Sequence, residues 1–131
     1  MALPNGAGGY QVGDGNLGEV TLGTSAIPTA YTAAATLTTA DLAGGAVVYT
    51  SASTADLALP AVSVVNTDIS SAKTNSSFEF SLIATSTGVP TITVGTGWTL
   101  VGVGTGVASR SVLFRAVKTS ATTYNLYRIA G

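Results

Sequence analysis

The stretch that decides the fold is Phe78–Thr85, with the sequence FEFSLIAT. Apolar residues occupy all of its even-numbered positions up to Ala84, whereas Glu79 and Ser81 interrupt the odd-numbered positions. A period of two is typical of a β-strand, because successive side chains point to opposite faces of a sheet. The stretch therefore predicts a strand that turns one face toward a core.

The same pattern recurs in shorter runs on both sides of this stretch. Further extended segments are predicted at Ala46–Thr50, Asp56–Pro60, Val62–Val65, Thr91–Val94, Trp98–Val101, Ser111–Thr119 and Thr123–Ile129. Turn-forming residues separate these runs, as they do in sandwiches and barrels. We therefore predict an all-β fold, an antiparallel sandwich or barrel with a jelly-roll-like arrangement. The helix signal is confined to one short turn that Thr38 or Thr39 would cap.

Two threonine-flanked segments resemble the hydroxyl ladders of ice-binding solenoids. They are Thr36-Leu37-Thr38 and Thr91-Ile92-Thr93. Such ladders do not recur here at a fixed period, and a regular period is the signature of a solenoid. The sequence therefore predicts no solenoid.

The N-terminal part of the chain differs from the rest in composition. Residues 1–33 are rich in glycine, which loses more backbone entropy on ordering than any other residue. Apolar and acidic side chains nevertheless recur in this part, so we expect an extended arm that orders against another protein surface, followed by a β-domain at 34–131. The candidate contact residues of the arm are Tyr10, Val12, Asp14, Leu17 and Glu19.

Ionisable residues are scarce. Asp, Glu, Lys and Arg make up 8% of the chain, against roughly 25% in ordinary globular proteins. The acidic residues dominate up to Asp68 and the basic residues from Lys73 onward. Such segregation suits contact between the two halves of neighbouring subunits. The few basic residues do not form the stripe that nucleic-acid binding requires, and we predict neither a nucleic-acid partner nor a membrane partner.

No catalytic, metal or cofactor site is predicted. The chain has no cysteine and no histidine, which removes thiolate ligands and the most frequent general base. Gly13-Asp14-Gly15-Asn16 resembles a fragment of a calcium loop, but only Glu19 lies near it as a further carboxylate. Serine nucleophiles have no activating histidine, so the sequence predicts a protein that is not an enzyme.

Several predicted strands are apolar on both faces, and this holds especially around Phe114 and Tyr127. In antiparallel proteins, such a strand is commonly covered on its outer face by another subunit. The sequence therefore predicts a homo-oligomer, and the candidate interface residues are Phe114, Arg115, Tyr127 and Arg128.

Trp98 supports an alternative of a different class. A tryptophan ring can stack on a sugar, although isolated aromatic residues at strand ends more often serve as core or interface anchors. The alternative prediction is thus a tail-fibre or receptor-binding module that recognises carbohydrate.

The order of motifs along the chain resembles a β-domain found among bacteriophage virion proteins. The segments that carry the resemblance are Gly9–Asn16, Leu37–Gly45, Leu57–Pro60, Ser77–Ile83, Gly95–Gly102, Phe114–Thr119 and Leu126–Ile129. The resemblance implies a capsid decoration (cement) protein, a trimer or less often a dimer that binds the outside of the shell. It also implies that the N-terminal arm reaches over the major capsid protein, in a virion assembled in the host cytoplasm.

Overall fold

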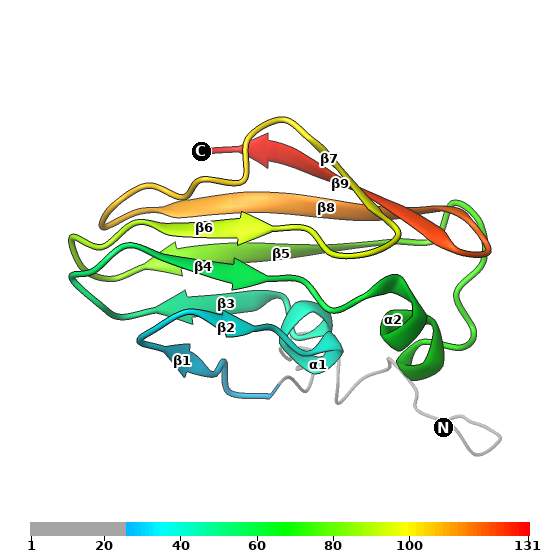
Figure 1. Cartoon of the computed structure of the whole chain (residues 1–131), viewed down its shortest axis with the longest axis horizontal. Coiled ribbons are helices and arrows are strands. Elements are labelled where there is room, and N and C mark those ends of the chain that lie inside the picture. The colour runs from blue at the N-terminus through cyan, green and yellow to red at the C-terminus, as the bar shows by residue number, and fades with distance from the viewer. Residues whose placement is uncertain (1–25) are drawn as a thin grey trace, which may run out of the picture.

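The computed structural model describes residues 26–131, which form two β-sheets and two short helices (Figure 1). The strands are β1 (Ala30–Tyr31), β2 (Ala35–Thr36), β3 (Ala46–Tyr49), β4 (Ala55–Ala58), β5 (Ser77–Ala84), β6 (Pro90–Thr93), β7 (Trp98–Val101), β8 (Ser111–Ser120) and β9 (Thr123–Ala130). The helices are α1 (Thr39–Ala43) and α2 (Val62–Asp68). The predicted mostly-β character is confirmed.

The strands are divided between two layers with the core between them. One sheet has six strands in the order β1-β3-β5-β8-β9-β7, and the other has three in the order β2-β4-β6. In Figure 1 the three-stranded sheet lies in front of the six-stranded sheet. The core side chains come from both sheets and both helices, and the largest fully buried ones are Tyr49, Tyr124, Phe80, Phe114, Leu37, Leu42, Leu57, Leu82, Ile92 and Leu126.

Most strand pairs run parallel. Among the strands of residues 26–131, only β5–β8 and β8–β9 pair in the antiparallel sense. The pairs β1–β3, β3–β5, β2–β4, β4–β6 and β7–β9 are parallel. The expectation of antiparallel pairing throughout was therefore wrong. Alternation of apolar residues reports which face of a strand is buried, and it carries no information about the direction of the neighbouring strand.

Four of the five parallel pairs, all except β7–β9, arise because the first half of the domain winds like a short solenoid. The chain passes from the six-stranded to the three-stranded sheet three times, in β1–β2, β3–β4 and β5–β6, and each passage stacks on the one before. Thr36 lies level with Ala58, and Ala58 with Thr93. The prediction of no solenoid was wrong for this half, because α1 and α2 are inserted between the passages and make the repeat unequal.

The two helices illustrate one confirmed and one wrong prediction. Helix α1 begins at the predicted cap: the Thr38 hydroxyl accepts a hydrogen bond from the Asp41 backbone, and the Asp41 carboxylate accepts one from the Thr38 backbone. Helix α2 replaces the extended segment that was predicted at Val62–Val65. Val62 and Val65 are three residues apart and both are buried, so one helical face packs into the core despite the β-propensity of valine.

The six-stranded sheet begins within the segment that was expected to form the arm. Ala30 and Tyr31 of β1 pair with Val48 and Tyr49 of β3. The sheet therefore starts before residue 34, the expected beginning of the β-domain.

Candidate functional site: the outer face of the six-stranded sheet

The carboxylates of the described residues lie apart from one another. In residues 26–131, no three carboxylate, cysteine or histidine side chains lie close enough to hold a metal ion. Asp41 is bound by Tyr31 and Thr38 in a structural contact, and Asp56 lies exposed on β4. No helix in this part of the chain is long and apolar enough to cross a membrane.

One surface of this domain faces away from the core and carries many apolar side chains among polar ones. We call it the outer face, and it consists of the side chains that point outward from the six-stranded sheet. Its apolar members are Ala30, Ala46, Val48, Ile83, Val101, Leu113, Val117, Tyr127 and Ile129, and its polar members are Ser77, Glu79, Ser81, Thr99, Ser111, Arg115 and Asn125. Val101 and Ile129 are the most exposed large aliphatic side chains of this face, at 44% and 46%.

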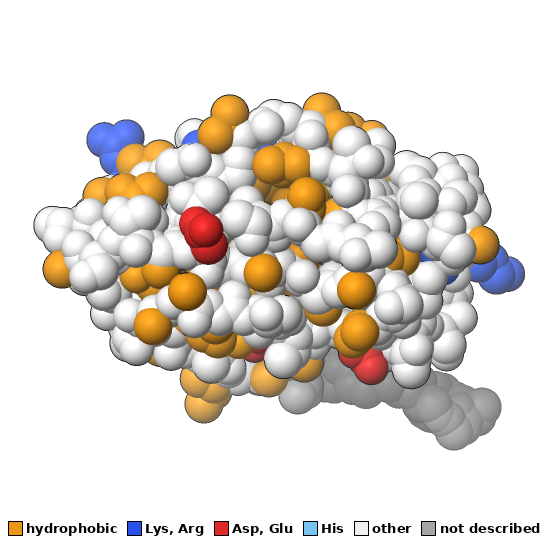
Figure 2. Space-filling view, viewed as in Figure 1, with side chains coloured by type: hydrophobic (Ala, Val, Ile, Leu, Met, Phe, Trp, Pro, Cys, Tyr) orange, Lys and Arg blue, Asp and Glu red, His pale blue; other side chains and the backbone are white. Residues whose placement is uncertain are grey.

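The opposite surface, over the three-stranded sheet, has a different character. Figure 2 shows that hydrophobic side chains are scattered there among polar atoms and do not gather in one patch. Thr36, Thr91 and Thr93 lie on the outward side of this sheet, together with Asp56. Scattered apolar groups are normal for a solvated surface. The outer face is therefore the stronger candidate for contact with another protein.

One ion pair occupies the outer face. Glu79 and Arg115 lie directly opposite each other on β5 and β8. Arg115 donates hydrogen bonds to Oε2 of Glu79 from Nε at 2.8 Å and from Nη2 at 2.6 Å. The two side chains are 43% and 47% exposed, so solvent screens the pair and its contribution to folding is small. An exposed ion pair of this kind is better suited to binding a partner than to stabilising the fold.

The four predicted interface residues separate into two groups. Arg115 and Tyr127 lie on the outer face and pair across β8 and β9. Phe114 does not, because its side chain is fully buried and stacks on Phe80 with ring centroids 5.5 Å apart. Arg128 donates to the carbonyls of Val103, Thr105 and Gly131, so its guanidinium ties together loops of its own chain. The inclusion of Phe114 was wrong.

The alternation in the sequence contained the information needed to avoid this error. Consecutive residues of a strand point to opposite faces, so Phe114 and Arg115 cannot both meet a partner. The same rule places Leu113 and Val117 with Arg115, and Ile83 with Glu79. The interface prediction omits these residues, although the odd-numbered positions of both strands indicate them.

The candidate residues of the arm, Tyr10, Val12, Asp14, Leu17 and Glu19, lie outside the described residues. Their assignment to capsid contact stays a prediction.

Trp98 is a core residue. Its side chain is 7% exposed, its ring lies 5.1 Å from that of Tyr124, and its Nε1 donates to the Pro60 carbonyl at 2.8 Å. A ring that is buried and whose N–H is already bonded in this way is not free to stack on a sugar. The idea that Trp98 binds carbohydrate was therefore wrong.

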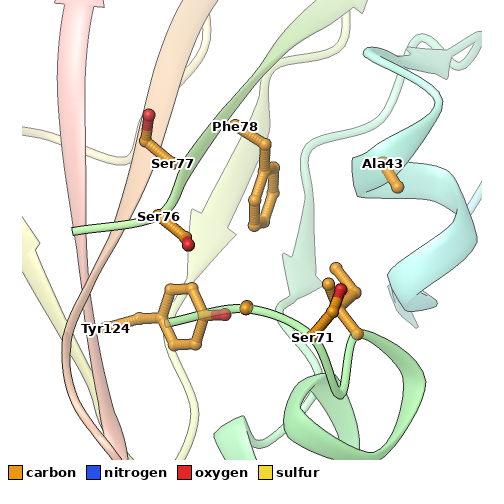
Figure 3. Close-up of a pocket in the computed structure, with 8 residues that line it drawn as sticks. Ala43, Ser71, Ser76, Ser77, Phe78 and Tyr124 are labelled. Carbon is orange, nitrogen blue, oxygen red and sulfur yellow. The ribbon is translucent and has the colours of Figure 1, made fainter. Parts of the chain in front are cut away.

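A small pocket of about 270 Å³ opens near the same aromatic cluster. Figure 3 shows the rings of Phe78 and Tyr124 facing it from β5 and β9, with Ala43 of α1 across the opening and Ser76 pointing inward. Its lining side chains carry no ionised group, so it suits a small neutral molecule. Burial raises the pKa of the Tyr124 phenol, which stays protonated near neutral pH.

A buried lysine lies beside this pocket. The Lys118 ammonium donates to Oδ1 of Asn66 at 3.0 Å and to the Ala72 carbonyl at 3.2 Å, and it lies 5.8 Å from the centre of the Tyr124 ring. These contacts hold the loop after α2 against the sheet. The ammonium is thus engaged in the structure of the pocket wall.

Comparison with protein-family models, with curated proteins and with solved structures finds no match to this chain.

Proposed function

We propose that this chain is a virion structural protein that decorates and stabilises a bacteriophage capsid by binding the major capsid protein as an oligomer. In this proposal the two sheets act as a rigid sandwich that presents the outer face to a second subunit. The residues of the arm, Tyr10 and Leu17 among them, provide the contact with the shell. The observation that carries the proposal is the outer face itself, on which aliphatic side chains and Tyr127 lie around one central ion pair.

Composition gives independent support. A protein with 8% charged residues lacks the ionic surface that keeps isolated domains soluble at high concentration. Assembly removes that difficulty, because much of the surface is then covered by other chains. Subunit contacts favour residues such as tyrosine, arginine and aliphatic groups, which the outer face presents in Tyr127, Arg115 and Val101.

The stabilising effect follows from mass action. A protein that binds the closed shell but not its dissociated parts lowers the free energy of the shell. An oligomer that repeats the contact gains avidity without any new type of contact. The carbohydrate-binding tail-fibre module remains the alternative proposal, and without Trp98 it would have to use the pocket beside Phe78.

The test uses capsid shells of the phage that encodes the chain, prepared without this protein. Adding the full chain should produce co-sedimentation with the shells and raise their temperature of disruption. The double variant Y10A/L17A should bind at least about tenfold more weakly, and D56A, altered on the opposite surface, should bind like the wild type. Shells that neither retain the wild-type chain nor change in stability would contradict the proposal.

A further inference from the structure

The ion pair of the outer face lies at the middle of the six-stranded sheet. It connects β5 to β8, with β1 and β3 beyond β5 on one side and β9 and β7 beyond β8 on the other. The line between β5 and β8 therefore divides the sheet into two halves of three strands each. A two-fold axis that runs parallel to the strands between β5 and β8 would place each half of one sheet over the other half of a second copy.

The hydrogen bonds of this pair leave part of each group available. Both bonds from Arg115 end on the same oxygen, Oε2 of Glu79. Among the described residues, neither Oε1 of Glu79 nor Nη1 of Arg115 takes part in a hydrogen bond. A carboxylate accepts from several donors and a guanidinium offers five, so both groups can add a partner without breaking their existing bonds.

The two-fold arrangement matches these free atoms. It brings Glu79 of one copy opposite Arg115 of the other, twice, so that four charges of alternating sign meet at the centre. Oε1 of each Glu79 would then accept from Nη1 of the opposing Arg115. An isologous interface requires a self-complementary patch of this kind.

The sizes of the neighbouring side chains follow the same symmetry. In the next row of the sheet, Ser81 on β5 is small and its neighbour Leu113 on β8 is large, and the row ends in the small residues Ala46 and Ala130. One row further, the large residues Ile83 and Val48 lie on the first half and Ser111 on the second. The axis places each row over itself with the halves exchanged, so large side chains meet small ones.

We propose that two copies of this chain pack face to face through the outer face, with Glu79 of each copy bound to Arg115 of the other. This inference rests on the proposed function in taking the outer face as the assembly surface, and it names a second copy as the occupant. The resemblance to decoration proteins favoured a trimer, but a three-fold axis would not bring the two charges of one copy onto those of a single neighbour.

The test measures the mass of the full chain in solution by light scattering and sedimentation equilibrium. The wild type is compared with E79R, with R115E, with an equimolar mixture of these two variants, and with the double variant E79R/R115E. The control is D56K, an acidic-to-basic change at an exposed position of the opposite surface. Circular dichroism of each variant verifies folding, which an exposed pair should affect little.

The wild type, D56K and E79R/R115E should be dimers. E79R and R115E alone place four like charges together, which should raise the dissociation constant roughly 100-fold. The mixture should restore a dimer with one copy of each variant, because one copy then carries two positive groups and the other two negative groups. A wild type that is a monomer or a trimer, or single variants that dimerise like the wild type, would overturn the inference.

Co-sedimentation of the wild type with capsid shells separates this inference from the proposed function. A monomeric chain that still binds shells overturns the dimer and supports decoration. A dimeric chain that responds to the charge reversals but ignores shells supports the dimer and overturns decoration.

Discussion

The phenol of Tyr31 donates a hydrogen bond to Oδ2 of Asp41, which ties the edge strand β1 to helix α1. The same oxygen accepts the Thr38 backbone N–H at 3.0 Å. One carboxylate thus caps the helix and holds the first strand of the six-stranded sheet. Strand β1 has two residues and, within residues 26–131, β3 is its only partner strand, so this bond is a substantial part of what fixes it there.

The first prediction concerns acid stability. Burial acts to raise the pKa of the Asp41 carboxyl, but hydrogen bonds from Tyr31 and Thr38 outweigh it and hold the pKa below the usual 3.8. The stabilisation is therefore present well above pH 3.8 and is lost as the pH falls through the lowered pKa. D41N should reduce the free energy of unfolding by about 1–2 kcal/mol at pH 7, and by less as the pH approaches 2.

Urea unfolding followed by the fluorescence of Trp98, the single tryptophan, measures this difference. D56N is the matched control, because Asp56 is an exposed aspartate on β4. A difference between the wild type and D41N that stays constant from pH 7 to pH 2 would show that the charge of Asp41 makes no contribution.

The second prediction concerns the stability of the fold at alkaline pH. Burial, together with the hydrogen bond and the negative charge of Asp41, raises the pKa of Tyr31 to about 12. The folded chain therefore favours the neutral phenol, and the resulting stability is present below pH 10 and is lost as the pH rises toward 12. Ultraviolet titration of the folded protein should show a tyrosine that ionises near pH 12 and that disappears in Y31F.

How much of this architecture the sequence predicts depends on what period-two alternation can report. Alternation located β5, β8 and β9 to within a few residues, because each strand is long and has one predominantly apolar side. It did not indicate that β3 and β4 belong to different sheets, since a short turn-like segment suits a hairpin and a crossing equally well. Helix α2 was missed because its valines favour strands and only the spacing of Val62, Val65 and Ile69 indicates a helix.

The sequence likewise predicts only part of the candidate surface. Alternation places Arg115 and Tyr127 outward, but the central position of the Glu79–Arg115 pair depends on strand order, which the sequence does not specify. The burial of Trp98 likewise depends on Pro60, which is distant in sequence and provides the carbonyl for its N–H.

The third prediction compares a core residue of β8 with an outer-face residue of the neighbouring strand β9. F114A removes a fully buried ring that stacks on Phe80 and should lower the free energy of unfolding by about 3–5 kcal/mol. Y127A, on the outward side of β9, should change folding stability much less and should weaken the proposed dimer instead. Thermal melting combined with light scattering measures both effects. Equal losses of stability in the two variants would contradict this assignment of faces.

The fourth prediction concerns the buried lysine. K118M keeps a side chain of similar length but leaves Oδ1 of Asn66 and the Ala72 carbonyl without their donor. Such a loss should lower the free energy of unfolding by about 1–3 kcal/mol. Hydrogen exchange measured by mass spectrometry should speed up mainly in residues 66–76. K73M, which changes an exposed lysine in the same loop, is the control and should leave the exchange unchanged.

The last prediction concerns β6, the strand at one edge of the three-stranded sheet. Gly104 accepts a hydrogen bond from the Ile92 backbone at 2.8 Å, and Gly106 donates one to the Pro90 carbonyl at 2.7 Å, so residues 104–106 cover the exposed edge of β6. A Cβ atom on Gly104 would lie 2.1 Å from the Ile92 carbonyl oxygen. No side-chain rotation relieves such a contact with backbone, and the covering segment must move away.

G104A should therefore destabilise the fold by about 1–3 kcal/mol and expose the β6 edge. Because an uncovered strand edge is a template for pairing with other chains, the variant should also aggregate more readily on heating. V103A changes the neighbouring side chain, which is 59% exposed, and should melt and aggregate like the wild type. If G104A matched V103A in both measurements, the close approach of Gly104 to β6 would have no role in protecting that edge.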